Sequence, residues 1–185
     1  MVVIPDAVRS TVLARIKRLD AEARLVVMRA SVIGRRFDLA ILVATASSPE
    51  VRVRIALDSA ERLQLIVRDG DERFSFRHAL TRDIVYAELQ ALGVRPLHRR
   101  IVRALERAAA CDDVPIEDLA YHAWAAVDAR RALRYNERAG DAAAALHALA
   151  DARTHYARAR SVVDVDSAPF LRLNEKLRAL EAQRV

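Results

Sequence analysis

The sequence lacks features that several classes of protein require. Its only cysteine, Cys111, cannot form an internal disulfide and does not by itself make a metal cluster. No apolar run approaches the roughly 20 residues that cross a bilayer. The opening MVVIPDAVRS has none of the three regions of a signal peptide. These absences predict a cytoplasmic protein that makes no membrane contact.

Glycine and proline are also scarce. Four glycines and five prolines, set against abundant alanine, leucine and arginine, predict a mainly helical fold. The glycines stand apart and none precedes a lysine, so the chain has no phosphate-binding loop of the GxxxxGKS or GxxxxGKT type. It also lacks GxSxG, HExxH and CxxC motifs. We therefore expect no enzyme active site in this chain.

The chain is basic, with a formal net charge of +6 and a pI near 10.2. Such a charge is a feature of proteins that bind nucleic acids. However, only Lys17 and Lys176 are lysines, so arginine supplies nearly all the positive charge. Because GC-rich codons also give an arginine- and alanine-rich composition, the charge alone is weak evidence for a polyanionic partner.

Residues 1–110 are predicted to form one domain that begins with four helices. Asp20 is the expected N-cap of the second helix and Gly34 its expected C-terminal stop. Ser48 and Pro49 are expected to open the fourth helix, which carries the apolar residues Val51, Ile55, Ala60 and Leu63. The first helix is expected after Asp6, the second over Ala21–Val32 and the third over Phe37–Ala44.

A change of periodicity follows these helices. The stretch LQLIVRDGDERFSF has two short extended runs around Asp69-Gly70, which predicts the only β-hairpin of the chain. Two more helices are expected after it, over His78–Leu92 and Pro96–Ala110. Helices, a hairpin and further helices in this order are typical of a winged-helix domain.

Residues 111–185 are predicted to form a second domain of helical repeats. After the polar break CDDVP come short alanine-rich helices in IEDLAYHAWAA, ARRALRYNERA, DAAAALHALA and ARTHYARARSVV. Such helices cannot bury their apolar faces alone, so we expect TPR-like antiparallel helical hairpins, tied together by Trp124 and Tyr135. A last helix over Phe170–Gln183 resembles the first half of a further pair, and we expect the array to continue.

Two groups of side chains are candidates for binding. The five histidines lack a nearby cysteine or a carboxylate pair at ligand spacing, so we expect no metal site. Arginines at every fourth position of one expected helix form a basic stripe. This stripe either meets phosphates or an acidic partner, or is simply a solvated face. Its members are Arg95, Arg99, Arg103 and Arg107.

Direct DNA binding is not expected. In a DNA-binding winged helix, the helix before the hairpin would enter the major groove. Here that helix is PEVRVRIALDSAERLQ, which mixes acidic with basic residues and has no face of asparagine, lysine or serine. The expected hairpin tip, DGDE, is acidic and would repel phosphate.

Four stretches, in order, carry a family resemblance: RLDAEARLVVMRASVIGRRFD, FSFRHALTRDIVYAEL, RPLHRRIVRALE and LAYHAWAA. Over about residues 5–160 the chain resembles the signal-transducing ATPases with numerous domains (STAND ATPases), which include LuxR-type regulators and adenylate-cyclase-associated ATPases. In that family a nucleotide-binding domain precedes a winged helix, and a helical-repeat sensor follows. The resemblance implies ATP or ADP in an upstream domain and no cofactor in this chain.

The resemblance also implies a role for His78. In related switch ATPases, a histidine that ends the hairpin and starts the next helix reaches the β-phosphate of ADP, and His78 of FRHAL occupies the matching place. The chain departs from the plant and animal pattern, because Ala79 stands where that pattern has aspartate. The alternative is a structural histidine that caps the junction and packs on Phe76 and Tyr86.

These observations favour a non-catalytic regulatory segment of a larger STAND-type ATPase or transcriptional regulator. It would relay nucleotide state from the upstream domain and bind a protein partner or inducer on its repeats, and an exposed repeat face would favour homo-oligomers. The alternative is a free-standing winged-helix DNA-binding transcription factor with a helical dimerisation arm.

Overall fold

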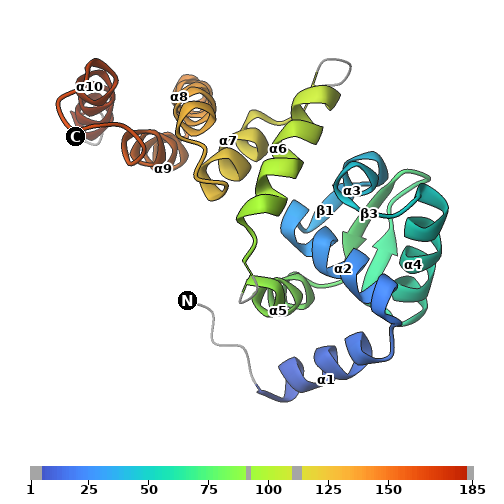
Figure 1. The fold of residues 1–185 in the computed structure, drawn as a ribbon. Helices are drawn as coiled ribbons and strands as arrows, with labels where there is room; N and C mark the ends of the chain where they lie inside the picture. The colour runs from blue at the N-terminus through green and yellow to red at the C-terminus, as the bar shows by residue number, and fades with distance from the viewer. Residues whose placement is uncertain (1–5, 91–92, 110–113, 183–185) are drawn as a thin grey trace. The chain divides into compact units, whose positions relative to one another are not determined.

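A computed structural model of the chain describes residues 6–90, 93–109 and 114–182 (Figure 1). These residues form ten helices and three short strands, so the prediction of a mainly helical chain is confirmed. They belong to two compact units, Met1–Ala104 and Leu105–Val185, called unit 1 and unit 2 below. The predicted boundary between residues 110 and 111 and the first three residues of the CDDVP break, 111–113, lie outside the described residues. Among the described helices, none has both the length and the apolar composition needed to cross a membrane.

Unit 1 begins with helices whose ends follow local sequence signals. The Asp20 carboxylate accepts a hydrogen bond from the Ala23 N–H at 2.7 Å, and the Gly34 N–H donates to the Ala30 carbonyl, which confirms both predicted caps of the second helix. The N-cap of the fourth helix is Pro49, and no side chain caps it. The helices are α1 (Asp6–Lys17), α2 (Ala21–Ile33), α3 (Leu39–Thr45), α4 (Glu50–Arg62), α5 (Ala79–Gln90) and α6 (Arg95–Ala108), which runs on into unit 2.

Unit 1 also contains a three-stranded antiparallel sheet. The strands are β1 (Arg36–Asp38), β2 (Ile66–Arg68) and β3 (Arg73–Phe76), in the spatial order β1-β3-β2. The predicted hairpin is confirmed as β2–β3, with Gly70 at a positive φ of 101° in its turn. Two predictions are wrong in part. The hairpin is not the only β element, because residues 36–38 pair with β3. The helix expected over Phe37–Ala44 begins only at Leu39.

Aromatic packing explains this difference. Phe37 of β1 lies opposite Phe74 of β3, with the ring centroids 6.0 Å apart, and its ring is 5.9 Å from that of Phe76. A three-residue strand shows no period in the sequence, so only this contact across the sheet reveals it.

The core of unit 1 lies between the sheet and the helices around it. Helix α2 packs against α4 and α5 (Figure 1). Helix α4 buries Val53, Ala56, Leu57 and Ala60. Val51 and Ile55 of α4 are instead 63% and 52% exposed. The outward side of α4 is therefore partly apolar.

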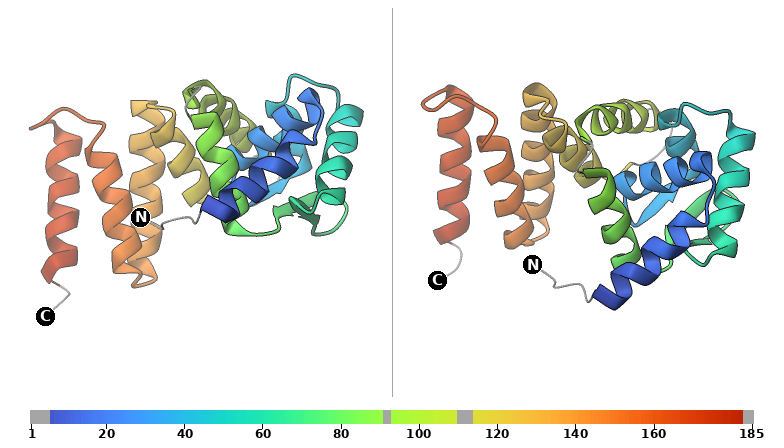
Figure 2. Two further views of the ribbon diagram at one scale, coloured as in Figure 1. Left: turned by 90° about the horizontal axis from the view of Figure 1, so that it is seen from below. Right: turned by 60° about the horizontal axis from the view of Figure 1, so that its bottom comes forward.

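Unit 2 is a row of helices that each pack on the next. Helix α8 packs against both α7 and α9, and α10 packs against α9 (Figure 2). ARRALRYNERA and the start of DAAAALHALA belong to one helix, which continues through Gly140. The helices are α7 (Ile116–Ala125), α8 (Ala129–Ala145), α9 (Leu149–Arg160) and α10 (Ala168–Ala182). The predicted end of the last helix at Gln183 lies outside the described residues, as does the predicted Leu92 end of the helix from His78.

A buried polar pair joins three of these helices. Asn136 of α8 donates from Nδ2 to the carbonyl of Ala120 in α7 at 2.8 Å. Its Oδ1 lies 3.2 Å from Nδ1 of His155 in α9. Because both side chains are buried, these hydrogen bonds fix the helices in one register.

Gly140 provides a test of the packing between α8 and α9. A Cβ at Gly140 would lie 2.5 Å from Cε1 of Tyr156, whose ring is buried and whose hydroxyl donates to Asp141. Replacing an exposed helical glycine by alanine normally raises the free energy of unfolding by roughly 1 kcal/mol. We expect Gly140→Ala instead to lower the free energy of unfolding by about 1–3 kcal/mol, because the ring cannot move away.

Urea denaturation followed by fluorescence of Trp124, the only tryptophan, measures this effect. In a Tyr156→Ala background the same Gly140→Ala change is expected to be neutral or stabilising. A stabilising effect in the wild-type background would contradict the close packing.

Candidate functional site

The junction between β3 and α5 gathers three basic residues from two places in the sequence. The Phe76 N–H donates to the Arg35 carbonyl at 2.8 Å, so Arg35 lies beside the end of β3. Arg77 and His78 follow Phe76 directly, and their side chains, like that of Arg35, are exposed. We call Arg35, Arg77 and His78 the basic corner.

His78 holds the backbone of this junction. Its carbonyl accepts hydrogen bonds from the N–H groups of Thr81 and Arg82, at 3.0 and 3.4 Å, so α5 opens on this residue. The imidazole itself is exposed, whereas Phe76 is buried. Tyr86 contacts the Arg82 guanidinium, 4.7 Å from its ring centroid, and its hydroxyl lies 3.5 Å from Nε2 of His98.

The basic corner has no neutralising partner within the part of the chain that the structure describes. Among the residues that the structure describes, no carboxylate forms an ion pair with Arg35 or Arg77. The N-terminal end of α5 adds the positive pole of its helix dipole at the same place. An anion that approached this corner would find hydrogen-bond donors whose charge is not already compensated.

The arginine stripe lies on the solvent side of α6. All four predicted members, Arg95, Arg99, Arg103 and Arg107, are exposed. Ile101, Ala104 and Leu105 on the other side of the helix are buried, as the spacing predicts. No ion pair joins the stripe to a carboxylate of the described residues.

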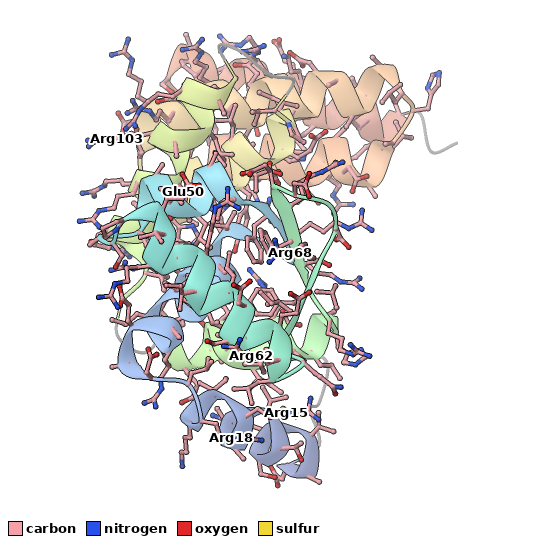
Figure 3. The ribbon with its side chains drawn as sticks, turned by 90° about the vertical axis from the view of Figure 1, so that its right-hand side faces the viewer. Arg15, Arg18, Glu50, Arg62, Arg68 and Arg103 are labelled. Carbon is pink, nitrogen blue, oxygen red and sulfur yellow. The ribbon has the colours of Figure 1, made fainter. Side chains whose placement is uncertain are left out.

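Two arginines of α4 and the hairpin, Arg54 and Arg68, are bound by carboxylates within unit 1. Arg54 donates to Glu50 at 2.8 Å and to Glu72 at 2.7 Å. Arg68 donates to Asp58 at 2.8 Å. Figure 3 shows Glu50 and Arg62 toward opposite ends of α4, with Arg68 on the hairpin beside it. The carboxylates here offset the charge that a phosphate backbone would require.

A groove in unit 2 holds residues that the sequence analysis did not select. Trp124, predicted to tie the repeats together, is 38% exposed and lines this groove with Arg153 and Arg158 of α9. Tyr135, the other predicted tie, is buried and donates its hydroxyl to Glu106 at 2.7 Å. The sequence does contain one indication of this surface. Neither Arg153 nor Arg158 has an acidic residue three or four positions away, so neither can form an ion pair along its own helix.

Among the described residues, the histidines do not gather with other possible metal ligands. In the described ranges, no three His, Cys, Asp or Glu side chains lie close enough to hold an ion. His98 is buried, and this burial, with the nearby Arg82, lowers its pKa to about 4, so its ring is neutral near pH 7. His155 is held by Asn136.

A cluster of charged side chains around Glu137 joins α8 to α10 and has a structural role. Glu137 of α8 accepts two hydrogen bonds from Arg172, both 2.8 Å, and one from Lys176 of α10. Lys176 also donates to Asp141, which accepts from Tyr156. The bidentate contact with Arg172 is the main reason why the pKa of Glu137 falls to about 2. Two carboxylates and two cations balance, so this cluster fastens α10 to α8.

The Glu137 cluster predicts a pH dependence of stability. Since the pKa is about 2 in the folded chain and 4.5 ordinarily, the stabilisation is complete above 4.5 and is lost as the pH falls from 4.5 to about 2. We expect Glu137→Gln to lower the free energy of unfolding by about 1–3 kcal/mol near neutral pH, and the difference from wild type to shrink over that window.

Urea denaturation at several pH values measures this difference. Glu175→Gln on the same α10 is the control, because Glu175 is exposed and forms no ion pair in the described part of the chain. An effect of Glu137→Gln that did not change between neutral and acidic pH would exclude the carboxylate charge as its source.

Comparisons with known proteins assign no role to any of these surfaces. No family model, no curated protein and no solved structure matches this chain. The roles of the basic corner, the arginine stripe and the groove are therefore inferred from their residues, contacts and charges.

Proposed function

We propose that the chain is a non-catalytic regulatory segment of a larger STAND-type ATPase or transcriptional regulator. Unit 1 would relay the nucleotide state of an upstream domain, and unit 2 would bind a protein partner or inducer. The observation that carries this proposal is the basic corner, where the backbone brings exposed Arg35, Arg77 and His78 to the junction of β3 and α5 without a carboxylate partner among the described residues.

The topology of unit 1 supports a winged-helix interpretation. Its elements run α2–β1–α3–α4–β2–β3, and the strand order is β1-β3-β2. In this interpretation β2–β3 is the wing, α4 takes the place of a recognition helix, and His78 follows the wing directly. The short connections between packed helices of unit 2 likewise support TPR-like hairpins.

The chemistry of the basic corner suits a terminal phosphate of a nucleotide. A guanidinium presents several N–H donors and an imidazole presents one or two, and such charge-assisted bonds are the strong ones. A corner that contacts bound ADP in one arrangement of the domains and not in another would favour the first arrangement. Its residues would thus hold a closed state rather than take part in hydrolysis.

A free-standing winged-helix transcription factor with a helical dimerisation arm is the second candidate. The unpaired arginine stripe of α6 favours it, because unpaired arginines attract phosphates. The helix α4 does not support it. The carboxylates of Glu50 and Glu72 bind Arg54, and the outward residues Val51 and Ile55 are apolar where base-reading side chains would be polar.

The first test is nucleotide retention in the longer protein. The reading frame around this chain is sequenced, and the chain is then expressed with the domain encoded upstream. We expect that domain to contain a phosphate-binding loop, and His78→Ala to weaken ADP retention roughly 10- to 100-fold, because one charge-assisted hydrogen bond is lost.

His147→Asn is the matched control for this test. His147 is also exposed, lies in unit 2 and has a positive φ of 57°, which asparagine tolerates. We expect it to leave ADP retention unchanged. An upstream sequence without a phosphate-binding loop, or equal retention in the wild type and the His78 variant, would contradict the proposal.

The second test separates the two candidates by the salt dependence of DNA binding. We expect weak binding of a mixed-sequence duplex at low salt and its loss near about 150 mM salt. Arg99→Gln with Arg103→Gln should abolish the low-salt binding, whereas Arg52→Gln with Arg54→Gln should not. Sequence-selective binding that persisted at physiological salt and depended on α4 would favour the transcription factor.

A further inference from the structure

The groove of unit 2 runs between the end of α7 and the exposed side of α9. It has a volume of about 420 Å³, is open to solvent, and is lined by Trp124, Arg153, Thr154, Ala157, Arg158 and Ser161. All six residues belong to unit 2. The helices that carry them are fixed by the buried Asn136 contacts, so the groove is formed before any ligand arrives.

The charge of this groove is positive and is not compensated by an ion pair among the described residues. Arg153 and Arg158 are its two charged lining residues, and neither forms an ion pair with a described carboxylate. Elsewhere in unit 2, Arg131 and Arg172 are held by Glu106 and Glu137.

Two carboxylates of these helices, Glu117 of α7 and Asp151 of α9, do not line the groove. Burial lowers the pKa of His155, as does Arg158, and Glu117 and Asp151 partly oppose this change. The two carboxylates therefore lie close enough to His155 to act on it. Neither carboxylate forms an ion pair with Arg153 or Arg158, so both guanidinium groups remain available to an anion in the groove.

Aromatic side chains hold one of the two arginines in place. The Arg158 guanidinium carbon lies 5.0 Å from the centroid of the Trp124 ring and 5.8 Å from that of Tyr121. The Trp124 Nε1–H donates to Ser161 Oγ at 3.4 Å, and that hydroxyl donates to the Arg158 carbonyl. The indole is fixed by these contacts and still offers an exposed apolar surface beside the charge.

The shape of this surface suits an extended ligand. A second groove of about 480 Å³ shares Arg153 and Thr154 with the first and continues to Leu180 and Glu181 of α10. Sites for small molecules usually enclose most of their ligand. Two open grooves that share Arg153 and Thr154 of α9 instead suit a peptide that lies across the helices.

We infer that the groove between α7 and α9 binds an acidic peptide segment of a partner protein, with carboxylates on Arg153 and Arg158 and an apolar side chain on Trp124. This inference rests on the proposed partner-binding role of unit 2. It requires no nucleotide, so it is tested separately from ADP retention.

Trp124 fluorescence of the full chain measures this binding, because no other tryptophan contributes. The probe is a terminally blocked peptide of about eight residues that alternates glutamate with leucine. We expect a saturable change in fluorescence at micromolar to millimolar peptide concentrations, and we expect the affinity to fall as salt is added. The peptide with glutamine in place of glutamate should not bind.

Variants on α9 and α8 identify the site. Arg153→Gln and Arg158→Gln are each expected to weaken the acidic peptide roughly tenfold. The control is Arg130→Gln with Arg138→Gln, which removes two exposed arginines of α8 that do not line the groove. The control variant should bind like the wild type.

Other outcomes would overturn the inference. These are equal binding of the glutamine peptide, no saturable change with the acidic peptide, or equal weakening by the α8 control. Tighter binding of a single-stranded oligonucleotide than of the peptide would assign the groove to nucleic acid instead. If the acidic peptide does not bind while ADP retention depends on His78, the inference about the groove is wrong and the proposed relay function stands.

Discussion

The contact between Phe37 and Phe74 across β1 and β3 determines where the basic corner of unit 1 forms. It pairs a three-residue strand with the hairpin, and the same register brings the Arg35 carbonyl to the Phe76 N–H. Without β1, Arg35 would have no reason to lie near Arg77 and His78. The place of Arg35 beside Arg77 and His78 at the start of α5 is therefore a consequence of aromatic packing between β1 and β3.

In unit 2 the corresponding constraint is the buried amide of Asn136. An unpaired amide in this interior would cost on the order of 1–3 kcal/mol. Its partners in α7 and α9 therefore select one arrangement of the helices. That arrangement brings Trp124 of α7 next to Arg158 and Ser161 at the end of α9. The groove is therefore positioned by buried hydrogen bonds between residues that do not line it.

The sequence predicted those features that depend on neighbouring residues. The Asp20 cap, the Gly34 stop and the Asp69-Gly70 turn each follow from the conformational preference of one or two residues, and all three are present. Strand β1 was missed because its pairing partner lies more than thirty positions away. The same holds for the partners of Arg54 and Arg172 in Glu72 and Glu137, since ion pairs across 18 and 35 positions leave no periodic pattern.

The basic corner was predicted only in part. His78 was identified from its motif, but Arg35 joins it through the sheet, which the sequence did not reveal. The groove was missed although its arginines have a local signal. An arginine that has no acidic neighbour at helical spacing must find a carboxylate in another element or remain uncompensated. Arg158 contacts two aromatic rings, and Arg153 is exposed to solvent.

The pairing of arginines also decides how the net charge of +6 is to be interpreted. A guanidinium that already donates to a carboxylate adds little to the field that an approaching anion feels. Arg54 of α4 and Arg68 of the β2–β3 hairpin are in this condition. In the described part of the chain, the unpaired arginines include those of the corner, the α6 stripe and the groove. Anionic partners are thus expected at these surfaces, and the aromatic rings beside Arg158 make the groove the one suited to a ligand that is both acidic and apolar.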